Sequence, residues 1–216
     1  MESLIKKLIN NRDYDGLRHA LSQNPNLAHE GIPYDDVNTT KASPLHRICD
    51  GVFSGKYTDE EAVDMARIFL EHGANLNGEK ISENQDTPLI AASSLQADKV
   101  AIFYIESGAD INRVGCHGGT ALHWAAWCGR PKVVGRLIQE GAEINKRCID
   151  FNATPLFWAV HGSKNGDINN THNYLECVKI LIQSGADKNI PNGAGKRVFD
   201  LLNNEDSGLK ELLIPD

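Results

Sequence analysis

Thr120-Ala121-Leu122-His123-Trp124-Ala125-Ala126 is the stretch that decides the fold, because similar stretches recur on both sides of it. Thr87-Pro88-Leu89-Ile90-Ala91-Ala92 precedes it and Thr154-Pro155-Leu156-Phe157-Trp158-Ala159 follows it, so the leading threonines are 33 and 34 residues apart. A closing phrase that begins with Gly-Ala ends each unit, at residues 108–112, 141–145 and 185–189. A repeat of this period predicts serial copies of one supersecondary unit.

The residue types within one unit predict two helices joined by a short turn. A threonine hydroxyl can accept a backbone N–H that the first helical turn leaves unpaired. Proline suits the next position, where no donor is needed, and Leu with Ala-Ala supplies an apolar face at helical spacing. The glycine of each closing phrase suits the left-handed position that ends a helix, and the Asn and Asp residues after it favour a turn.

The period and the Thr-Pro-Leu-His type of phrase resemble the ankyrin repeat. A further copy starts at Ser43-Pro44-Leu45-His46, and a degraded one lies at 195–202, where Arg197 replaces the capping residue. The resemblance implies an all-α ankyrin-repeat solenoid of helix–turn–helix units with projecting β-hairpin-like loops, in a single elongated domain. We expect repeats at 39–77, 78–112, 113–145 and 146–189, between an N-terminal capping repeat at 1–38 and a C-terminal one at 190–216.

The two outer full repeats are longer than the two inner ones. The distance from the leading residue to the closing glycine is 30 and 31 residues in the outer repeats, against 21 in each inner repeat. We therefore expect insertions at 50–57 and 162–170 between the paired helices. Thr58-Asp59-Glu60-Glu61 has the spacing of a capping box and predicts where the second helix restarts, and a similar restart is expected near Thr171. Insertions in repeat proteins often lie on the binding face, although drift of a surface loop explains them equally simply.

Composition limits the classes of function. The chain has 216 residues, 41% of them hydrophobic, and a formal charge of −7 from 22 basic and 29 acidic residues. Without a basic stripe, this balance argues against nucleic-acid binding and is compatible with a basic protein partner. No apolar run is long enough to span a membrane, and the N-terminus does not resemble a signal peptide. Five dispersed cysteines indicate free thiols, so we expect a cytoplasmic, monomeric protein without membrane attachment;.

The ankyrin resemblance implies non-catalytic binding of a partner protein through a concave face built from loop tips and first helices, without any cofactor or metal. A dedicated inhibitor or regulator of a basic or mixed-charge partner is the sharper version of this expectation. Carrying the family's variable positions over gives candidate binding residues in both kinds of element. They are Thr39, Thr40, Glu83, Asn84, Asp86, Cys116, His117, Asp150 and Phe151 in loops, and Asp50, Ser94, Trp127, Cys128 and His161 in first helices.

Two aromatic residues are the strongest of these candidates. Trp127 follows the Ala125-Ala126 pair at a position that usually faces outward in this family, and exposed tryptophan is typical of interface anchors. Packing against Trp158 is the alternative. Phe151 is an apolar residue in a polar turn, so it requires a partner either outside the chain or within its own loop beside Ile149. Trp124 and Trp158 occupy a semi-buried family position and are expected in the core.

Other chemistry is less well supported by the sequence. His46 and His123 occupy the motif histidine, which in this family has a structural hydrogen-bonding role. A thiol-based redox or metal sensor is the alternative function, because Cys116, His117, Cys128, Cys148 and His161 lie on adjacent repeats, but they lack the spacing of a zinc motif. A Cys–His nucleophile has no recognisable oxyanion hole, and 193–196 lacks the residues of a phosphate-binding loop. Self-association through a repeat face is the third possibility.

Overall fold

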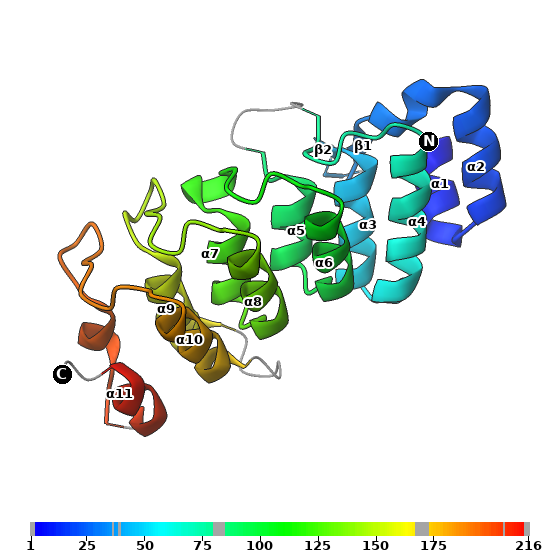
Figure 1. Ribbon diagram of the computed structural model, residues 1–216. Coiled ribbons are helices and arrows are strands. Elements are labelled where there is room, and N and C mark those ends of the chain that lie inside the picture. The colour runs from blue at the N-terminus through cyan, green and yellow to red at the C-terminus, as the bar shows by residue number, and fades with distance from the viewer. Residues whose placement is uncertain are drawn as a thin grey trace. The chain divides into compact units, whose positions relative to one another are not determined.

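The computed structural model describes residues 3–35, 37–38, 40–79, 85–166, 173–204 and 206–213. The chain is mostly helical and forms two compact units, Met1–Asp110 and Ile111–Asp216. In each unit, helices that follow one another along the chain lie side by side in pairs, as Figure 1 shows. This is the all-α architecture of ankyrin-repeat solenoids that the sequence predicts.

The first unit contains three helix pairs and a small hairpin among its described residues. Its elements are α1 (Leu4–Asn11), α2 (Tyr14–Gln23), a 3₁₀ turn η1 (Pro25–His29), β1 (Ile32–Pro33), β2 (Lys41–Ala42), α3 (Pro44–Phe53), α4 (Asp59–Glu71), α5 (Pro88–Ser94) and α6 (Asp98–Glu106). The helices α1, α3 and α5 pack in one row, and α2, α4 and α6 pack in a second row beside it. The core between the rows consists of side chains such as Ile5, Leu17, Leu45, Phe69 and Tyr104.

The second unit repeats this arrangement. Its elements are a 3₁₀ turn η2 (Cys116–Gly118), α7 (Ala121–Trp127), α8 (Pro131–Gln139), α9 (Pro155–Asn165), α10 (Tyr174–Gln183), a 3₁₀ turn η3 (Val198–Leu201) and α11 (Ser207–Leu213). Helix α7 packs against α9, and α8 packs against α10. The degraded phrase near Arg197 thus forms only a short 3₁₀ turn, followed by the terminal helix α11.

Three of the four predicted capping residues make the expected hydrogen bonds, whereas the hydroxyl of the fourth, Thr120, lies 2.9 Å from Nδ1 of His123. The hydroxyls of Ser43, Thr87 and Thr154 each accept the backbone N–H three residues on, at 3.2–3.4 Å. Thr58 and Glu61 form the predicted reciprocal capping box, which lowers the pKa of the Glu61 carboxyl through its bond with the Thr58 backbone N–H;. Local hydrogen bonding of this kind explains why the same polar residue opens successive repeats.

The asparagine that ends each closing phrase has a structural role as well. The Oδ1 atoms of Asn77, Asn112 and Asn145 accept backbone N–H groups of the following closing phrase, at Asp110, Glu143 and Asp187 respectively, at 2.8–2.9 Å. One repeat therefore fixes the turn of the next, and the recurrence of Asn at this position reflects an interaction between repeats within each unit.

The projecting loops have the predicted hairpin character. In the first unit, β1 and β2 pair antiparallel, with Ile32 opposite Ala42 and Pro33 opposite Lys41. In the second unit, the loop from Gly115 to Gly119 closes through a single backbone hydrogen bond of 3.0 Å between these two residues. Hairpin geometry thus recurs in loops too short to form strands.

The two predicted insertions are partly helical. Helix α3 continues to Phe53 and α9 continues to Asn165, so the first residues of both 50–57 and 162–170 extend the preceding helix. The expected restart at Thr171 lies outside the described residues. Helix α10 begins at Tyr174 with Asn173 as its cap. The repeat boundaries and the single elongated domain stay predictions.

Helix α6 is capped by a residue from the preceding repeat. Its own N-cap, Ala97, has no side-chain oxygen, and the carboxylate of Asp59 on α4 instead accepts the N–H groups of Lys99 and Val100 at 2.7 and 3.1 Å. Burial raises the pKa of Asp59, and these two hydrogen bonds oppose that shift. The carboxylate therefore joins α4 to the positive end of α6.

Asp59→Ala is expected to weaken α6 by about 1–2 kcal/mol, because two helix N–H groups lose their acceptor. Amide hydrogen exchange at Lys99 and Val100 measures this directly, and both should exchange faster. Asp59→Asn keeps one acceptor oxygen, so its exchange rates at these two amides should lie between those of Asp59→Ala and the wild type. Asp64→Ala, an exposed change on the same helix, serves as the control. Equal protection in Asp59→Ala and Asp64→Ala would contradict this capping role.

Candidate functional site

The loops of the second unit lie side by side and are joined through their backbones. The N–H of Ile149, before α9, donates to the carbonyl of His117, before α7, at 3.1 Å. The N–H of Gly193, after α10, donates to the carbonyl of Phe151 at 2.8 Å. These bonds hold three successive loop tips in fixed positions relative to one another. They thereby position the side chains at these tips.

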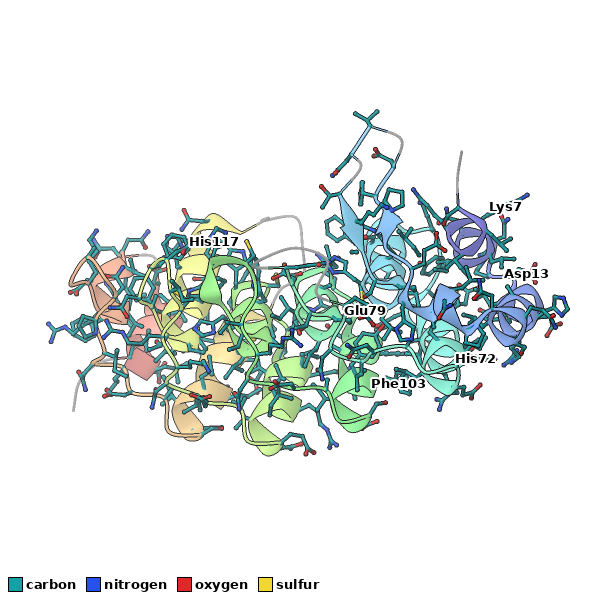
Figure 2. The ribbon with its side chains drawn as sticks, turned by 90° about the horizontal axis from the view of Figure 1, so that it is seen from above. Lys7, Asp13, His72, Glu79, Phe103 and His117 are labelled. Atoms are coloured by element: carbon teal, nitrogen blue, oxygen red, sulfur yellow. The ribbon has the colours of Figure 1, made fainter. Side chains whose placement is uncertain are left out.

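His117, labelled in Figure 2, is held in an uncommon conformation at the first of these tips. Its φ of +58° lies in the left-handed region that few residues other than glycine adopt;. Its Nδ1 lies 2.8 Å from the Asp150 carboxylate on the next loop, and its ring centroid lies 5.4 Å from that of Phe151. The side chain thus links two loop tips one repeat apart, which helps to hold the backbone in this conformation.

Helices α7 and α9 contribute aromatic side chains beneath these loops. Trp124 and Trp127 are three residues apart on α7, so they share one face of that helix, and Trp158 and His161 are spaced alike on α9;. The Trp127 and His161 rings lie 5.2 Å apart between centroids. Because α7 and α9 pack directly together, these two faces form one continuous aromatic surface.

Trp158 is the centre of this cluster. Its ring meets Trp124 at 5.2 Å and 81°, Trp127 at 6.0 Å and 73°, and Phe151 at 6.2 Å and 63°, measured between centroids and ring planes. Edge-to-face contacts of this kind are the arrangement that aromatic rings prefer. Gly119 permits the approach, because a Cβ there would stand 3.2 Å from Trp158 and 3.3 Å from Trp124.

The cluster surrounds a pocket of about 320 Å³. Its walls are almost entirely carbon, with Phe151 at the loop edge 51% exposed and Trp127 half-buried. The lining residues are His117, Trp124, Trp127, Phe151, Ala153, Phe157, Trp158, His161 and Asn192. A pocket of this size and lining suits one apolar or aromatic-binding group rather than a large polar ligand.

The buried polar groups next to the pocket are structural. His123 accepts the Thr120 N–H through Nδ1 at 3.1 Å and donates from Nε2 to the Ala153 carbonyl at 3.2 Å, as expected for the motif histidine. Burial lowers the pKa of His123 to about 4, so the ring is neutral at pH 7;. The buried Nε1 of Trp124 has no hydrogen-bond partner within the described part of the chain.

The structure brings together several of the residues that the sequence predicts as a binding set. Trp127, Phe151, His117 and His161 line the pocket, and Asp150 stands beside it. Trp127 packs against Trp158, the alternative considered for it, and still keeps part of its surface exposed. Phe151 contacts neighbouring rings rather than folding back on its own loop.

The predicted residues of the first unit make intrachain interactions instead. Asp50 pairs with Arg47 at 2.6 Å, and the Ser94 hydroxyl donates to the Ala91 carbonyl at 3.2 Å. Asp86 is half-buried beside His46, whose pKa is lowered mainly by burial. The backbone carbonyl of the exposed Thr40 accepts a hydrogen bond from the Arg47 guanidinium. Thr39, Glu83 and Asn84 lie outside the described residues. Their role in binding stays a prediction.

The cysteines do not gather into a reactive centre in the described structure. None of the five forms a disulfide bond in the described structure; Cys49, Cys148 and Cys177 are buried, whereas Cys116 and Cys128 are half-buried. Among the residues that the structure describes, no three His, Cys, Asp or Glu side chains lie close enough to hold a metal ion. The predicted redox or metal sensor therefore gains no support from the arrangement of these side chains.

The candidate set from the sequence lacks five pocket residues, which are Trp124, Ala153, Phe157, Trp158 and Asn192. Trp158 is 5% exposed, as a core assignment predicts, yet it lines the pocket. The signal was present in the spacing, because Trp158 is 34 residues from Trp124 and so lies beside it in the next repeat. Asn192 comes from a loop whose approach to α9 no local pattern encodes.

Comparison with known proteins supports the repeat assignment. A family model described as ankyrin repeats (3 copies) matches residues 114–192. The mouse protein named Palmitoyltransferase ZDHHC13 is 31% identical over 138 residues, which cover 59% of this chain and 21% of that protein. A variola virus protein named Ankyrin repeat protein OPG189 is 25% identical over 169 residues, covering 77% of this chain and 27% of the viral protein.

A third relative, Palmitoyltransferase Hip14 of Drosophila melanogaster, is 32% identical over 91 residues, 42% of this chain and 13% of that protein. The chain thus spans about a fifth of the length of the mouse relative. Within the described ranges, every helix is too short or too polar to cross a bilayer. The repeat phrases, the paired helices and the family match agree, and residues 114–192 are therefore ankyrin repeats.

Proposed function

We propose that this chain is a non-catalytic module that binds a partner protein through the second unit, with the aromatic pocket at the centre of the contact. The observation that carries the proposal is the pocket of about 320 Å³ with Trp127 half-buried and Phe151 half-exposed at its edge. Ankyrin repeats bind proteins, and hot spots of protein interfaces are enriched in tryptophan that is packed on one side;. A rigid repeat presents such side chains with little loss of entropy.

A non-catalytic role fits the chemistry of the site. His117 and Asp150 form a pair that resembles a base with its orienting carboxylate. The described residues that line the pocket, however, include no Ser, Thr, Cys or Lys that could serve as a nucleophile beside it;. The relatives named palmitoyltransferases match this chain over between 13% and 21% of their length, so their activity is not part of the proposal.

The acidic balance of the chain favours a partner with basic or mixed charge;. An inhibitory or regulatory role follows if the pocket captures a segment that the partner needs for its own activity. The lack of disulfide bonds among the five cysteines of the described structure fits a reducing compartment, and we propose a cytoplasmic location for the complex;.

Trp127→Ala is expected to weaken binding of the partner by about 30-fold or more, as loss of a tryptophan hot spot does. The measurement is affinity capture with the purified chain, followed by titration of the captured protein. Phe53→Ala is the matched control, because Phe53 is an exposed aromatic residue of the first unit. The proposal fails if Trp127→Ala, shown to be folded by circular dichroism, binds the captured protein as tightly as Phe53→Ala does.

A further inference from the structure

We infer that the aromatic pocket receives the trimethylammonium end of a methylated lysine on the partner protein. This inference rests on the proposed protein-binding function and specifies the chemistry of the group that enters the pocket. Three properties of the site lead to it: the mutual orientation of its rings, the scarcity of hydrogen-bond acceptors in its walls, and the sign of the charge beside it.

The rings enclose the pocket from several directions. Trp124, Trp127 and Phe151 stand at 81°, 73° and 63° to Trp158, so none of these rings stacks on it, and all four rings line the pocket from α7, from the loop before α9 and from α9 itself. A group in the pocket therefore meets aromatic surfaces on more than one side. The electron-rich faces of aromatic rings, tryptophan best of all, attract cations, and sets of such rings recognise quaternary ammonium groups.

The walls offer few acceptors to a cation that carries N–H groups. The polar side chains that line the pocket are His117, His161 and Asn192. An unmodified lysine brings three donors and an arginine brings five, and each donor that loses water without gaining an acceptor opposes binding. A trimethylammonium group has no N–H, spreads its charge over three methyl groups and packs well against carbon. The pocket thus selects the methylated cation over the unmodified ones.

A negatively charged side chain lies beside the pocket, as a cationic ligand requires. The Asp150 carboxylate lies at the rim, 2.8 Å from Nδ1 of His117, whose ring contacts Phe151. A carboxylate can only accept hydrogen bonds, so Nδ1 of His117 donates to Asp150;. The described lining contains no Lys or Arg side chain, and the whole chain carries a formal charge of −7. A cation is therefore attracted to this surface, whereas a carboxylate or phosphate group is repelled.

The chain contains a built-in reporter for this test. Its three tryptophans are Trp124, Trp127 and Trp158, and all three line the pocket. Intrinsic tryptophan fluorescence therefore reports on this site alone. The probes are three blocked amino acids, Nα-acetyl-lysine methylamide, its Nε-trimethylated form, and the carbon analogue in which a tert-butyl group replaces trimethylammonium. The last two have nearly the same shape and differ in charge.

We expect a saturable fluorescence change with the trimethylated probe and a dissociation constant at least about threefold lower than that of the tert-butyl analogue, as a desolvated cation–π contact requires. Unmodified lysine should bind at least about tenfold more weakly than the trimethylated probe, because its donors stay unpaired. Broadening of the N-methyl proton signal of the probe provides a readout that does not depend on the fluorophores. Trp127→Ala should abolish that broadening, and Phe53→Ala should retain it.

Each other outcome overturns the inference in a recognisable way. Equal affinity for the trimethylated and tert-butyl probes would mean that the pocket takes a neutral apolar side chain, and the protein-binding proposal would survive. Equal or tighter binding of unmodified lysine would exclude selection for methylation. Absence of a response to every probe, while Trp127→Ala still loses the partner protein, would remove the methyl-lysine inference alone. If no probe gives a response and Trp127→Ala still binds the partner protein, the proposed function is wrong as well.

Discussion

Gly162→Ala is expected to lower the free energy of unfolding of the second unit by about 2 kcal/mol, as overpacking of a close helix contact does. Gly162 lies within α9, where a Cβ would stand 2.4 Å from the carbonyl oxygen of Trp127 and 3.1 Å from its carbonyl carbon. Because these are backbone atoms, no side-chain rotation relieves the clash, and α7 must move away from α9. The gain in helix propensity from Gly to Ala, about 0.5–1 kcal/mol, offsets only part of this cost.

Urea denaturation followed by tryptophan fluorescence measures the effect, since all three tryptophans belong to the second unit. Gly135→Ala is the control, because Gly135 lies within α8 and nothing stands within 4 Å of a Cβ built there. This control should raise the stability by about 0.5–1 kcal/mol through helix propensity alone. If both substitutions change the free energy of unfolding in the same direction, the close approach of α7 and α9 at Gly162 does not contribute to stability.

Gly162 also shows where prediction from sequence stops. Its neighbours Ser163 and Asn165, and the glycine itself, have the composition of a loop, and the sequence therefore predicts an insertion that begins there. The structure continues α9 to Asn165 because Gly162 is buried against the backbone of α7. A glycine needed for close packing and a glycine needed for a turn look the same in one sequence.

Local interactions were predictable to the residue. The capping box of Thr58 and Glu61 and the caps at Ser43, Thr87 and Thr154 follow from hydrogen bonds that span three residues. The cap that Asp59 gives to α6 was not predictable in this way, since its donors are 40 and 41 residues away. Interactions between repeats depend on register and distance across the stack, which periodicity alone fixes only coarsely.

In the candidate site, too, the features that depend on one repeat were predictable and those that depend on contacts between repeats were not. Trp127 and Phe151 were predicted as surface residues from their place in the repeat, and both lie at the pocket. Trp158 was predicted in the core and is indeed buried, but the pocket exists because three other rings gather around its edge. Burial and participation in a site are separate properties, and only the orientation of neighbouring rings reveals the second.

The stability of the second unit is expected to fall by about 3 kcal/mol as the pH drops from about 7 to below 4, because of His123. Burial lowers the pKa of this histidine from its ordinary value of 6.5 to about 4 in the folded chain. The unfolded chain therefore takes up a proton below pH 6.5, whereas the folded chain resists protonation until about pH 4. Stability is complete above pH 6.5 and is lost progressively between these two values.

The hydrogen bonds of His123 explain why protonation is resisted. Nδ1 accepts the Thr120 N–H at 3.1 Å, and a proton on that nitrogen would take away this acceptor from a buried N–H group;. His123→Gln provides the comparison, since glutamine at the third helical position also accepts the N–H of the capping residue. Tryptophan fluorescence in urea at pH 7.5, 6.5, 5.5 and 4.5 yields both profiles for the second unit.

The stability of His123→Gln should decline less steeply with falling pH than that of the wild type. The two stability profiles should diverge most between pH 6 and 4.5. His46, whose pKa burial also lowers, lies in the first unit and so has little influence on this fluorescence signal. Parallel profiles would assign the acid sensitivity to other groups. A wild-type profile that stays flat to pH 4.5 would mean that the folded chain accepts the proton at His123, and the space between Thr120 and Ala153 would then have to admit water.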